Sequence, residues 1–274
     1  MKKINILLSI VLFAMSSTLV GQNITKLGIT GFHAKFADDS KLLVTTDNYT
    51  GLRSVDLKTK KENILSDVRR AGKAIIIDNK IVFGDRTSAT IMDFDGRKIK
   101  TVEKKRDTSF RQVAFKENIS SAKKGSSDLV SANSINRLTA IELVYADGTS
   151  KIIKPLGSDA QYLQTEISPN GKFILIKQYG GNGYLMSNKG EMIIDLGYME
   201  APSWAGNDAV VFQVTKDNGD IITDSDIYKV GINSRVRTNL TINFSKIAMD
   251  PTANADGSKI IFNTDNGELY LITK

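Results

Sequence analysis

The chain has 274 residues, with 37 lysines and arginines against 30 aspartates and glutamates, a single histidine and no cysteine. This composition excludes a disulfide-stapled scaffold and a zinc site built from several histidines or cysteines. The small basic excess is spread along the chain and is not interleaved with stacking aromatics, so the sequence argues against a nucleic-acid-binding protein.

The N-terminal segment has the pattern of a secretory signal peptide. Met1 is followed by Lys2 and Lys3, residues 4–20 are almost wholly apolar, and Gly21-Gln22 returns the chain to polar composition. A basic start, an apolar core of this length and a small residue at its end are the features of a cleaved signal. We therefore expect a signal peptide at 1–21 and a mature domain at 22–274, periplasmic or secreted and without stable membrane insertion. A retained membrane anchor is the alternative.

A polar turn followed by a short apolar run recurs six times in the mature chain. The turns fall at Asp39, Asn79, Asn118, Asn170, Asn207 and Asp256, which are 37 to 52 residues apart. Asn-Gly and Asp-Gly pairs between apolar runs are strong hairpin signals, because glycine adopts the positive φ that these turns require. Repeats of ~40–50 residues are typical of four-stranded propeller blades.

The expected strands follow this repeat along the chain. They are residues 41–44 in the first unit, 81–83 and 90–94 in the second, 113–115 in the third, 172–176, 184–186 and 191–194 in the fourth, 209–212 and 226–230 in the fifth, and 259–262 and 268–272 in the sixth. Residues 116–134 of the third unit, rich in Ser, Lys and Asn, are expected to be a polar insertion, either a solvated loop or a partner-docking arm.

The two ends of the mature chain favour a closed ring. The sixth unit has three strands, whereas residues 23–27 resemble the fourth strands of other units. Pairing of these segments would cover an otherwise exposed sheet edge. We therefore predict an all-β fold, a six-bladed β-propeller of four-stranded blades closed by the N-terminal strand. A β-sandwich, and five or seven blades, are the alternatives.

Several of these units resemble the WD40-like repeat of the TolB family. The residues that carry the resemblance are Asp250-Pro251 with Ala255-Asp256-Gly257, Ser168-Pro169-Asn170-Gly171, Ala201-Pro202-Ser203-Trp204, and Ser225-Asp226-Ile227-Tyr228. The resemblance is strong over 160–274 and faint over 30–150. It implies a six-bladed propeller in a bacterial periplasm or outer envelope that acts as a protein-binding module.

The sequence offers few groups for catalysis. His33 is the single imidazole, and no Gly-x-Ser-x-Gly nucleophile motif occurs. We expect a non-enzymatic protein without a cofactor; a hydrolase or lyase that uses carboxylates alone is an alternative. The calcium candidates are the acidic side chains of one polar loop, Asp217, Asp220, Asp224 and Asp226, which are also ordinary residues for a solvated propeller loop.

We expect binding on the face that gathers the longer loops. In an up-and-down blade, the loops between the second and third strands and the links between blades emerge on the same face. Its tyrosines and arginines are Tyr49, Arg70, Arg86, Arg106, Arg137, Tyr162, Tyr179 and Tyr198. Because Tyr and Arg are enriched in interface cores, we expect a monomeric domain whose partner is another envelope protein. The alternative is carbohydrate or small-molecule binding at the channel mouth with Trp204 as a stacking platform, although Trp204 also fits a packing role between blades.

Overall fold

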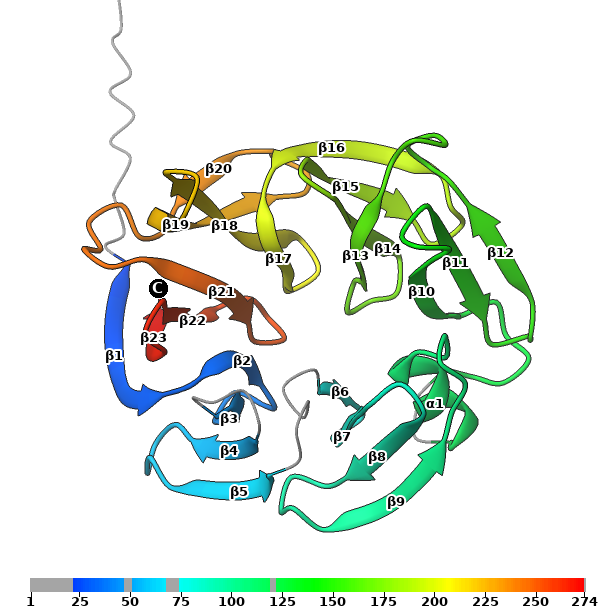
Figure 1. Ribbon diagram of the computed structural model, residues 1–274, viewed down its shortest axis with the longest axis horizontal. Coiled ribbons are helices and arrows are strands. Elements are labelled where there is room, and N and C mark those ends of the chain that lie inside the picture. Colours follow the sequence, from blue (N-terminus) through cyan, green and yellow to red (C-terminus); the bar gives the residue numbers. More distant parts are fainter. Residues whose placement is uncertain (1–21, 47–50, 68–73, 119–121, 274) are drawn as a thin grey trace, which may run out of the picture.

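The computed structural model describes residues 22–46, 51–67, 74–118 and 122–273, and its strands form six sheets arranged in a ring (Figure 1). Neighbouring strands in every sheet are antiparallel, and each sheet forms one blade. The arrangement confirms the predicted six-bladed β-propeller.

The blades are numbered here in chain order. Blade 1 contains β2 (Phe32–Phe36), β3 (Lys41–Thr45), β4 (Leu52–Asp56) and β5 (Glu62–Ser66). Blade 2 contains β6 (Ile75–Ile77), β7 (Lys80–Gly84), β8 (Ser88–Met92) and β9 (Lys98–Glu103). Blade 3 contains β10 (Leu129–Ile135), β11 (Ala140–Tyr145) and β12 (Ser150–Ile153), and is preceded by helix α1 (Phe110–Lys116).

The second half of the ring consists of three four-stranded blades. Blade 4 contains β13 (Tyr162–Ile167), β14 (Phe173–Gln178), β15 (Asn182–Ser187) and β16 (Met192–Tyr198). Blade 5 contains β17 (Glu200–Ala205), β18 (Ala209–Asp217), β19 (Ile222–Gly231) and β20 (Arg237–Asn239). Blade 6 contains β21 (Ala248–Ala253), β22 (Lys259–Thr264), β23 (Glu268–Thr273) and the N-terminal β1 (Asn23–Thr30).

The N-terminal strand closes the ring. β1 pairs antiparallel with β23, with Asn23 opposite Thr273 and Lys26 opposite Tyr270. In Figure 1 the blue strand therefore lies beside the red one, although they come from opposite ends of the sequence. Leu27 and Ile29 of β1 are buried against residues of blades 1 and 6, so the closing strand also belongs to the core. The predicted closure is confirmed.

Blade 3 departs from the prediction. Its sheet has three strands, and residues 113–115, predicted as the first strand of the unit, lie in α1. Ser109 caps this helix, because its hydroxyl accepts from the Gln112 backbone N–H while the Gln112 side chain accepts from the Ser109 N–H. The expected polar insertion 116–134 is also wrong in part, since β10 begins at Leu129 and pairs with β11.

The apolar core lies between neighbouring blades. In the described part of the chain it forms six clusters, and in each of them two neighbouring elements of the ring meet. At blade 2 the partner is α1, whose Val113 and Ala114 pack against Ile77, Val82 and Ile91. The helix thus fills a junction where the repeat would place a strand. In the described part of the chain, no helix has the length and apolar character needed to cross a membrane.

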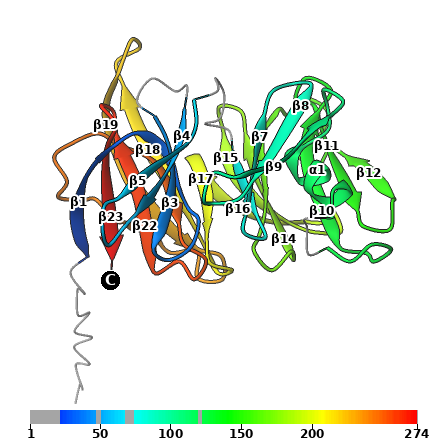
Figure 2. The same cartoon turned by 90° about the horizontal axis from the view of Figure 1, so that it is seen from below.

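The ring has two different faces, which are seen edge-on in Figure 2. Because the strands of a blade alternate in direction, the connections from first to second and from third to fourth strand lie on one face, called here the tight-turn face. The second-to-third connections and the links between blades lie on the other, called here the loop face. The β18–β19 hairpin extends beyond the ring on the loop face (Figure 2).

Candidate functional site

A cavity of about 590 Å³ lies at the centre of the ring. Its walls come from β2, β6, α1, β13, β17 and β21, so it is lined by every blade except blade 3, where α1 contributes Arg111 instead. Apolar walls alternate with charged groups: Phe36, Ile75 and Ile76 line it together with Lys35 and Glu166. The cavity is therefore large enough for a small ligand and carries polar groups that could orient one.

The innermost strands are irregular where they line this cavity. Pairing with the next strand shifts register within β2, β13, β17 and β21. At three of these bulges a residue other than glycine has positive φ: His33 at 49°, Ala201 at 42° and Asp250 at 52°. Such strain is tolerated where the surrounding structure enforces it, and bulges redirect side chains. The bulges here bring His33, Ala201 and Asp250 into the cavity wall.

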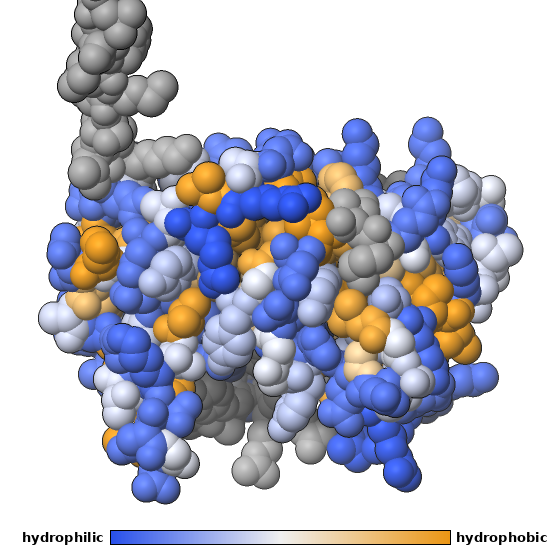
Figure 3. All heavy atoms as spheres, turned by 90° about the horizontal axis from the view of Figure 1, so that it is seen from above, coloured by the Kyte–Doolittle hydropathy of each residue, from blue (hydrophilic) through white to orange (hydrophobic). Residues whose placement is uncertain are grey.

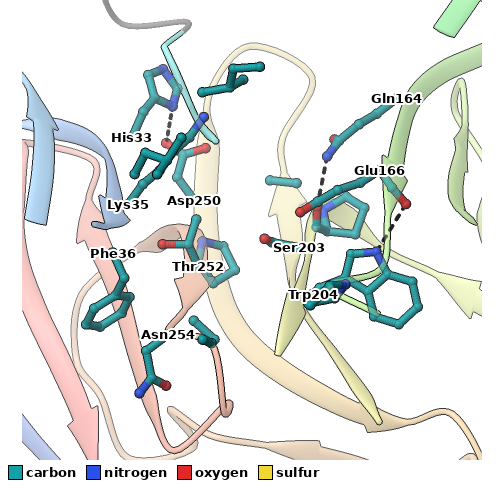
Figure 4. Close-up of a pocket in the computed structure, with 18 of the residues that line it drawn as sticks. His33, Lys35, Phe36, Gln164, Glu166, Ser203, Trp204, Asp250, Thr252 and Asn254 are labelled. Carbon is teal, nitrogen blue, oxygen red and sulfur yellow. Dashed lines mark hydrogen bonds and ion pairs between the residues drawn. The ribbon is translucent and has the colours of Figure 1, made fainter. Parts of the chain in front are cut away.

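Lys35 and Glu166 project into the cavity from opposite sides (Figure 4). Burial lowers the pKa of the Lys35 ammonium, and the Glu166 carboxylate opposes this shift. Burial raises the pKa of Glu166, against the attraction of Lys35 and of the Arg111 guanidinium. Burial likewise lowers the pKa of Arg111. Three mutually interacting charges are therefore held in a poorly solvated space, which is the kind of environment found at ligand sites.

Other polar side chains that line the cavity already have hydrogen-bond or ion-pair partners within the protein. His33 Nδ1 lies 3.6 Å from a carboxylate oxygen of Asp250, Gln164 Nε2 donates to the Pro202 carbonyl at 2.9 Å, and the Trp204 indole N–H donates to the Glu166 carbonyl at 3.1 Å (Figure 4). Trp204 is 4% exposed and packs in the core between blades 4 and 5. This is the packing role between blades that the sequence also offered for Trp204; the indole borders the cavity, but little of it is open to a stacked ligand.

The eight residues predicted on the loop face differ in their exposure to solvent. Arg86, Arg106 and Arg137 are exposed, and Tyr179 and Tyr198 are 64% and 41% exposed. Tyr162 is completely buried, with its hydroxyl accepting from the Leu156 N–H and donating to the Gly157 carbonyl. Tyr162 is therefore a core residue, and its predicted binding role is wrong. The predicted residues Tyr49 and Arg70 lie outside the described part of the chain.

Two further apolar side chains share the loop face with these tyrosines. Leu163 at the start of β13 is 49% exposed, and Ile221 in the β18–β19 turn is 65% exposed. With Tyr179 after β14 and Tyr198 at the end of β16, they form a set from blades 4 and 5 that we call the apolar loop-face set. No signal in the sequence pointed to Leu163 and Ile221, because only tyrosines and arginines of this face stood out as interface residues.

Polar and charged neighbours hold the Tyr198 side chain in position. The Tyr198 hydroxyl donates to Glu200, whose second carboxylate oxygen accepts from the Thr215 hydroxyl at 2.5 Å. The hydrogen bond to Glu200 raises the pKa of Tyr198 to about 12. The ammonium of Lys177 lies 5.5 Å from the centre of the Tyr198 ring and donates to the Gln178 and Gly181 carbonyls. Tyr198 is therefore fixed in place while its ring stays exposed.

The four calcium candidates are not gathered into one site. Asp224 forms an ion pair with Lys216, with oxygen and nitrogen 2.7 Å apart. Asp226 accepts from Asn239 and Thr241, and Asp217 accepts from the Gly219 N–H. Asp220 is also part of no such site: among the described residues, no group of three or more His, Cys, Asp or Glu side chains could hold a metal ion.

The outer side of the ring differs from the loop face in the distribution of its exposed apolar residues. In the view of Figure 3 most of it is polar, and its apolar residues form several separate groups. Exposed apolar side chains of the outermost strands include Ile64 on β5, Ile99 on β9 and Ile152 on β12. They come from three different blades, whereas the apolar loop-face set comes from two adjacent ones.

Comparison with known proteins identifies the fold. No family model matches the chain, and no curated protein matches it. Among solved structures, the WD40 domain of Neurospora crassa Pan2 is 11% identical, with a TM-score of 0.53 over 91% of this chain and 95% of that one. A catalytically inactive virginiamycin B lyase from Staphylococcus aureus with quinupristin is 13% identical, with a TM-score of 0.54 over 92% and 99%.

A streptogramin B lyase is similar to the same extent. It is 9% identical, with a TM-score of 0.50 over 92% of this chain and 97% of that one. At these identities the likeness shows a β-propeller and nothing finer. The TolB-like resemblance of the sequence is not confirmed by any of these comparisons.

Proposed function

We propose that this chain is an exported, non-enzymatic binding module whose propeller engages another protein of the cell envelope through its loop face. The observation that carries the proposal is the apolar loop-face set: Leu163, Tyr179, Tyr198 and Ile221 expose large side chains on one face of two adjacent blades. Aromatic side chains are enriched in the buried cores of interfaces, because they offer a large contact area together with a polar group.

The architecture around this set supports a docking role. Glu200, Thr215 and Lys177 hold Tyr198 in one position, so the ring loses little freedom when a partner covers it. Ile221 lies in the turn of the β18–β19 hairpin, which extends beyond the ring and could contact the flank of a bound protein (Figure 2). Propellers commonly serve as rigid scaffolds for loops that bind.

The place of action and the family are part of the same proposal. The basic and apolar pattern of residues 1–21 supports export, with a mature protein that starts near Gln22. The Ser168-Pro169-Asn170-Gly171 and Ala255-Asp256-Gly257 turns support a divergent TolB-like propeller. These turns build the blades, so this resemblance bears on ancestry and leaves the partner unidentified.

The test begins with the mature protein as bait in an envelope fraction from the native host. A captured protein is identified by mass spectrometry and purified, and its Kd for the propeller is measured directly. Tyr179→Ala and Tyr198→Ala on the loop face are compared with Ile152→Ala on β12, an exposed side chain (60%) of an outermost strand.

We expect each tyrosine variant to weaken binding by roughly 30-fold, the effect of an interface anchor worth ~2 kcal/mol, and Ile152→Ala to leave the Kd unchanged. Equal Kd values for all three variants would place the interface elsewhere and reject the loop face. A measured turnover of the partner or of a small molecule by the wild-type protein would reject the non-enzymatic role.

A further inference from the structure

The central cavity contains charges that the proposed protein docking does not use. Lys35 of β2 donates one hydrogen bond, to the Ala74 carbonyl at 2.8 Å. Arg111 of α1 lines the same cavity and, among the described residues, has no hydrogen-bond or ion-pair partner; its electrostatic neighbours are Glu166 and Lys35. A guanidinium has five N–H donors, so Arg111 keeps donors for a ligand in the cavity that it lines.

The cluster has an excess of positive charge. Lys35 and Arg111 are two cations beside the one carboxylate of Glu166, and these three groups interact with one another. The other acid of the wall, Asp250, lies beside His33, so the excess belongs to this cluster and the whole wall has as many acids as cations. Poor solvation makes an uncompensated charge costly, as the depressed pKa values of Lys35 and Arg111 show. A single negative charge placed between these cations would offset it. Glu166 repels any anion at this position, and it repels a dianion about twice as strongly as a monoanion.

The uncharged walls suit an organic body more than a bare inorganic ion. Phe36, Ile75, Ile76 and the prolines Pro202 and Pro251 line the cavity beside the charged groups. Its volume of about 590 Å³ lies within the ~300–1,000 Å³ of ordinary small-molecule sites. Arginine pairs with a carboxylate through two parallel hydrogen bonds, which would fix the orientation of such a ligand.

We propose that the central cavity is a binding site for a small organic acid, with the ligand carboxylate held by Arg111 and Lys35 and opposed by Glu166. Glu166 acts here as a selectivity residue, because its charge competes with the ligand for the two cations. The positive-φ residues His33, Ala201 and Asp250 lie in the same wall and are strained positions of the kind that cluster at ligand sites. This site is separate from the loop-face set.

The experiment is isothermal titration calorimetry of the full mature protein with acetate, propionate and benzoate, and with inorganic phosphate for comparison. We expect at least one of the three acids to bind with a Kd of about 1 mM or tighter and more strongly than phosphate. Arg111→Gln and Lys35→Gln should each weaken this binding about tenfold, since each removes a charged hydrogen-bond donor.

The decisive variant is Glu166→Gln, which should change affinity in the opposite direction. Removing the competing carboxylate should strengthen binding of the same acid about tenfold, whereas a residue that only maintained the shape of the cavity would weaken it when changed. Lys98→Gln, an exposed lysine on the outermost strand β9, is the matched control for loss of one positive charge.

Absence of binding by all three acids overturns the proposal, as does binding that Arg111→Gln and Lys98→Gln reduce equally. Weaker binding in Glu166→Gln overturns the assigned role of that carboxylate. Should Arg111→Gln fail to fold, Lys35→Gln and Glu166→Gln still give opposite expected signs. Docking of a protein partner is measured separately, as the Kd for the captured protein. A failure of acid binding therefore does not affect the docking proposal, and a failure of docking does not affect acid binding.

Discussion

The two faces of the ring differ in how their turns and loops are packed. On the tight-turn face, turns of adjacent blades contact each other: Asn170 N–H donates to the Asn207 side chain at 2.9 Å, and Asn254 Nδ2 donates to Asp39 at 2.8 Å. On the loop face, Gly180 and Gly219 have open space where a side chain would be, and Tyr179 is largely exposed. The turns of the tight-turn face join blades, whereas these parts of the loop face are open to a partner.

This difference predicts that a loop's length is a poor guide to its contribution to stability. The short turns of the tight-turn face repeat in the sequence because each one must fit against its neighbour. On the loop face the Tyr198 hydroxyl links blade 4 to Glu200 of blade 5, but Leu163, Tyr179 and Ile221 remain exposed, so the surface there presents apolar side chains. We therefore expect substitutions on the two faces to separate stability from binding.

The largest effect is expected from deletion of β1, because this strand joins the two ends of the ring. Removing residues 23–30 exposes the paired edge of β23 and the core residues that Leu27 and Ile29 cover. Burial of each of these side chains contributes roughly 1.5–3 kcal/mol, and an open strand edge promotes aggregation. Size-exclusion chromatography and thermal melting should show aggregation and loss of the cooperative transition. A monomer that melts like the parent contradicts the closure.

The next largest effect concerns two glycines of the tight-turn face that have the same backbone conformation but different surroundings. Gly257 has φ of 71°, and a Cβ there would lie 2.7 Å from the Ala205 carbonyl group of blade 5. Gly171 has φ of 70°, and a Cβ there would meet nothing within 4 Å. Gly257→Val should therefore lose about 3 kcal/mol or more, from both strain and the clash.

Gly171→Val is the matched comparison, because it carries the strain without the clash. We expect it to lose about 1–2 kcal/mol in urea unfolding. The difference between the two variants measures the contact between blades 5 and 6. Equal losses of unfolding free energy would show that the turns of the tight-turn face do not stabilise one another. The two faces would then not differ in the way described.

A smaller effect is expected on the loop face where the ring closes. Glu268 of β23 forms ion pairs with Lys26 of β1 and Lys246, and hydrogen bonds from these lysines lower its pKa to about 2. Because the folded pKa lies below the unfolded value of 4.5, the contribution to stability is present above pH 4.5 and is lost as pH falls through about 2.

The measurement compares melting temperatures of the wild type and Glu268→Gln across this range. The wild type should melt higher at pH 7, and the two should converge near pH 2. Since both lysines are substantially exposed, the difference at pH 7 should be small. A constant difference at all pH values would mean that the carboxylate charge does not hold the closing strand.

The sequence predicted the ring because its turns obey local rules. Asn170 and Asp256 start turns whose glycines have positive φ, and such turns require only neighbouring residues. The same rule failed at Asn118, which has φ of 61° but follows a helix instead of a strand. The signal for that helix was present in the sequence as Ser109 and Gln112, the spacing of a capping box.

The candidate sites were harder to predict, because they depend on the whole ring. Lys35, Arg111 and Glu166 come from β2, α1 and β13, and no local pattern relates them. Bulges in the innermost strands also disturb the alternation of inward and outward side chains. Tyr162 was misplaced for a related reason: it stands at the loop-face end of β13, but its ring turns into the core, where its hydroxyl has two backbone partners.

The smallest change in stability is expected for the apolar loop-face set itself, and this prediction completes the comparison. Tyr179→Ala, Ile221→Ala and Leu163→Ala each remove a side chain that is about half exposed or more, so each should alter the free energy of unfolding by about 0.5 kcal/mol or less. Tyr198→Ala also removes the hydrogen bond to Glu200 and the ring beside Lys177, so it should cost slightly more. Urea unfolding of the four variants beside Gly257→Val tests this order. A loss near that of Gly257→Val in Tyr179→Ala or Ile221→Ala would show that these side chains hold blades 4 and 5 together, and the loop face would then be a second structural seam instead of a surface for a partner.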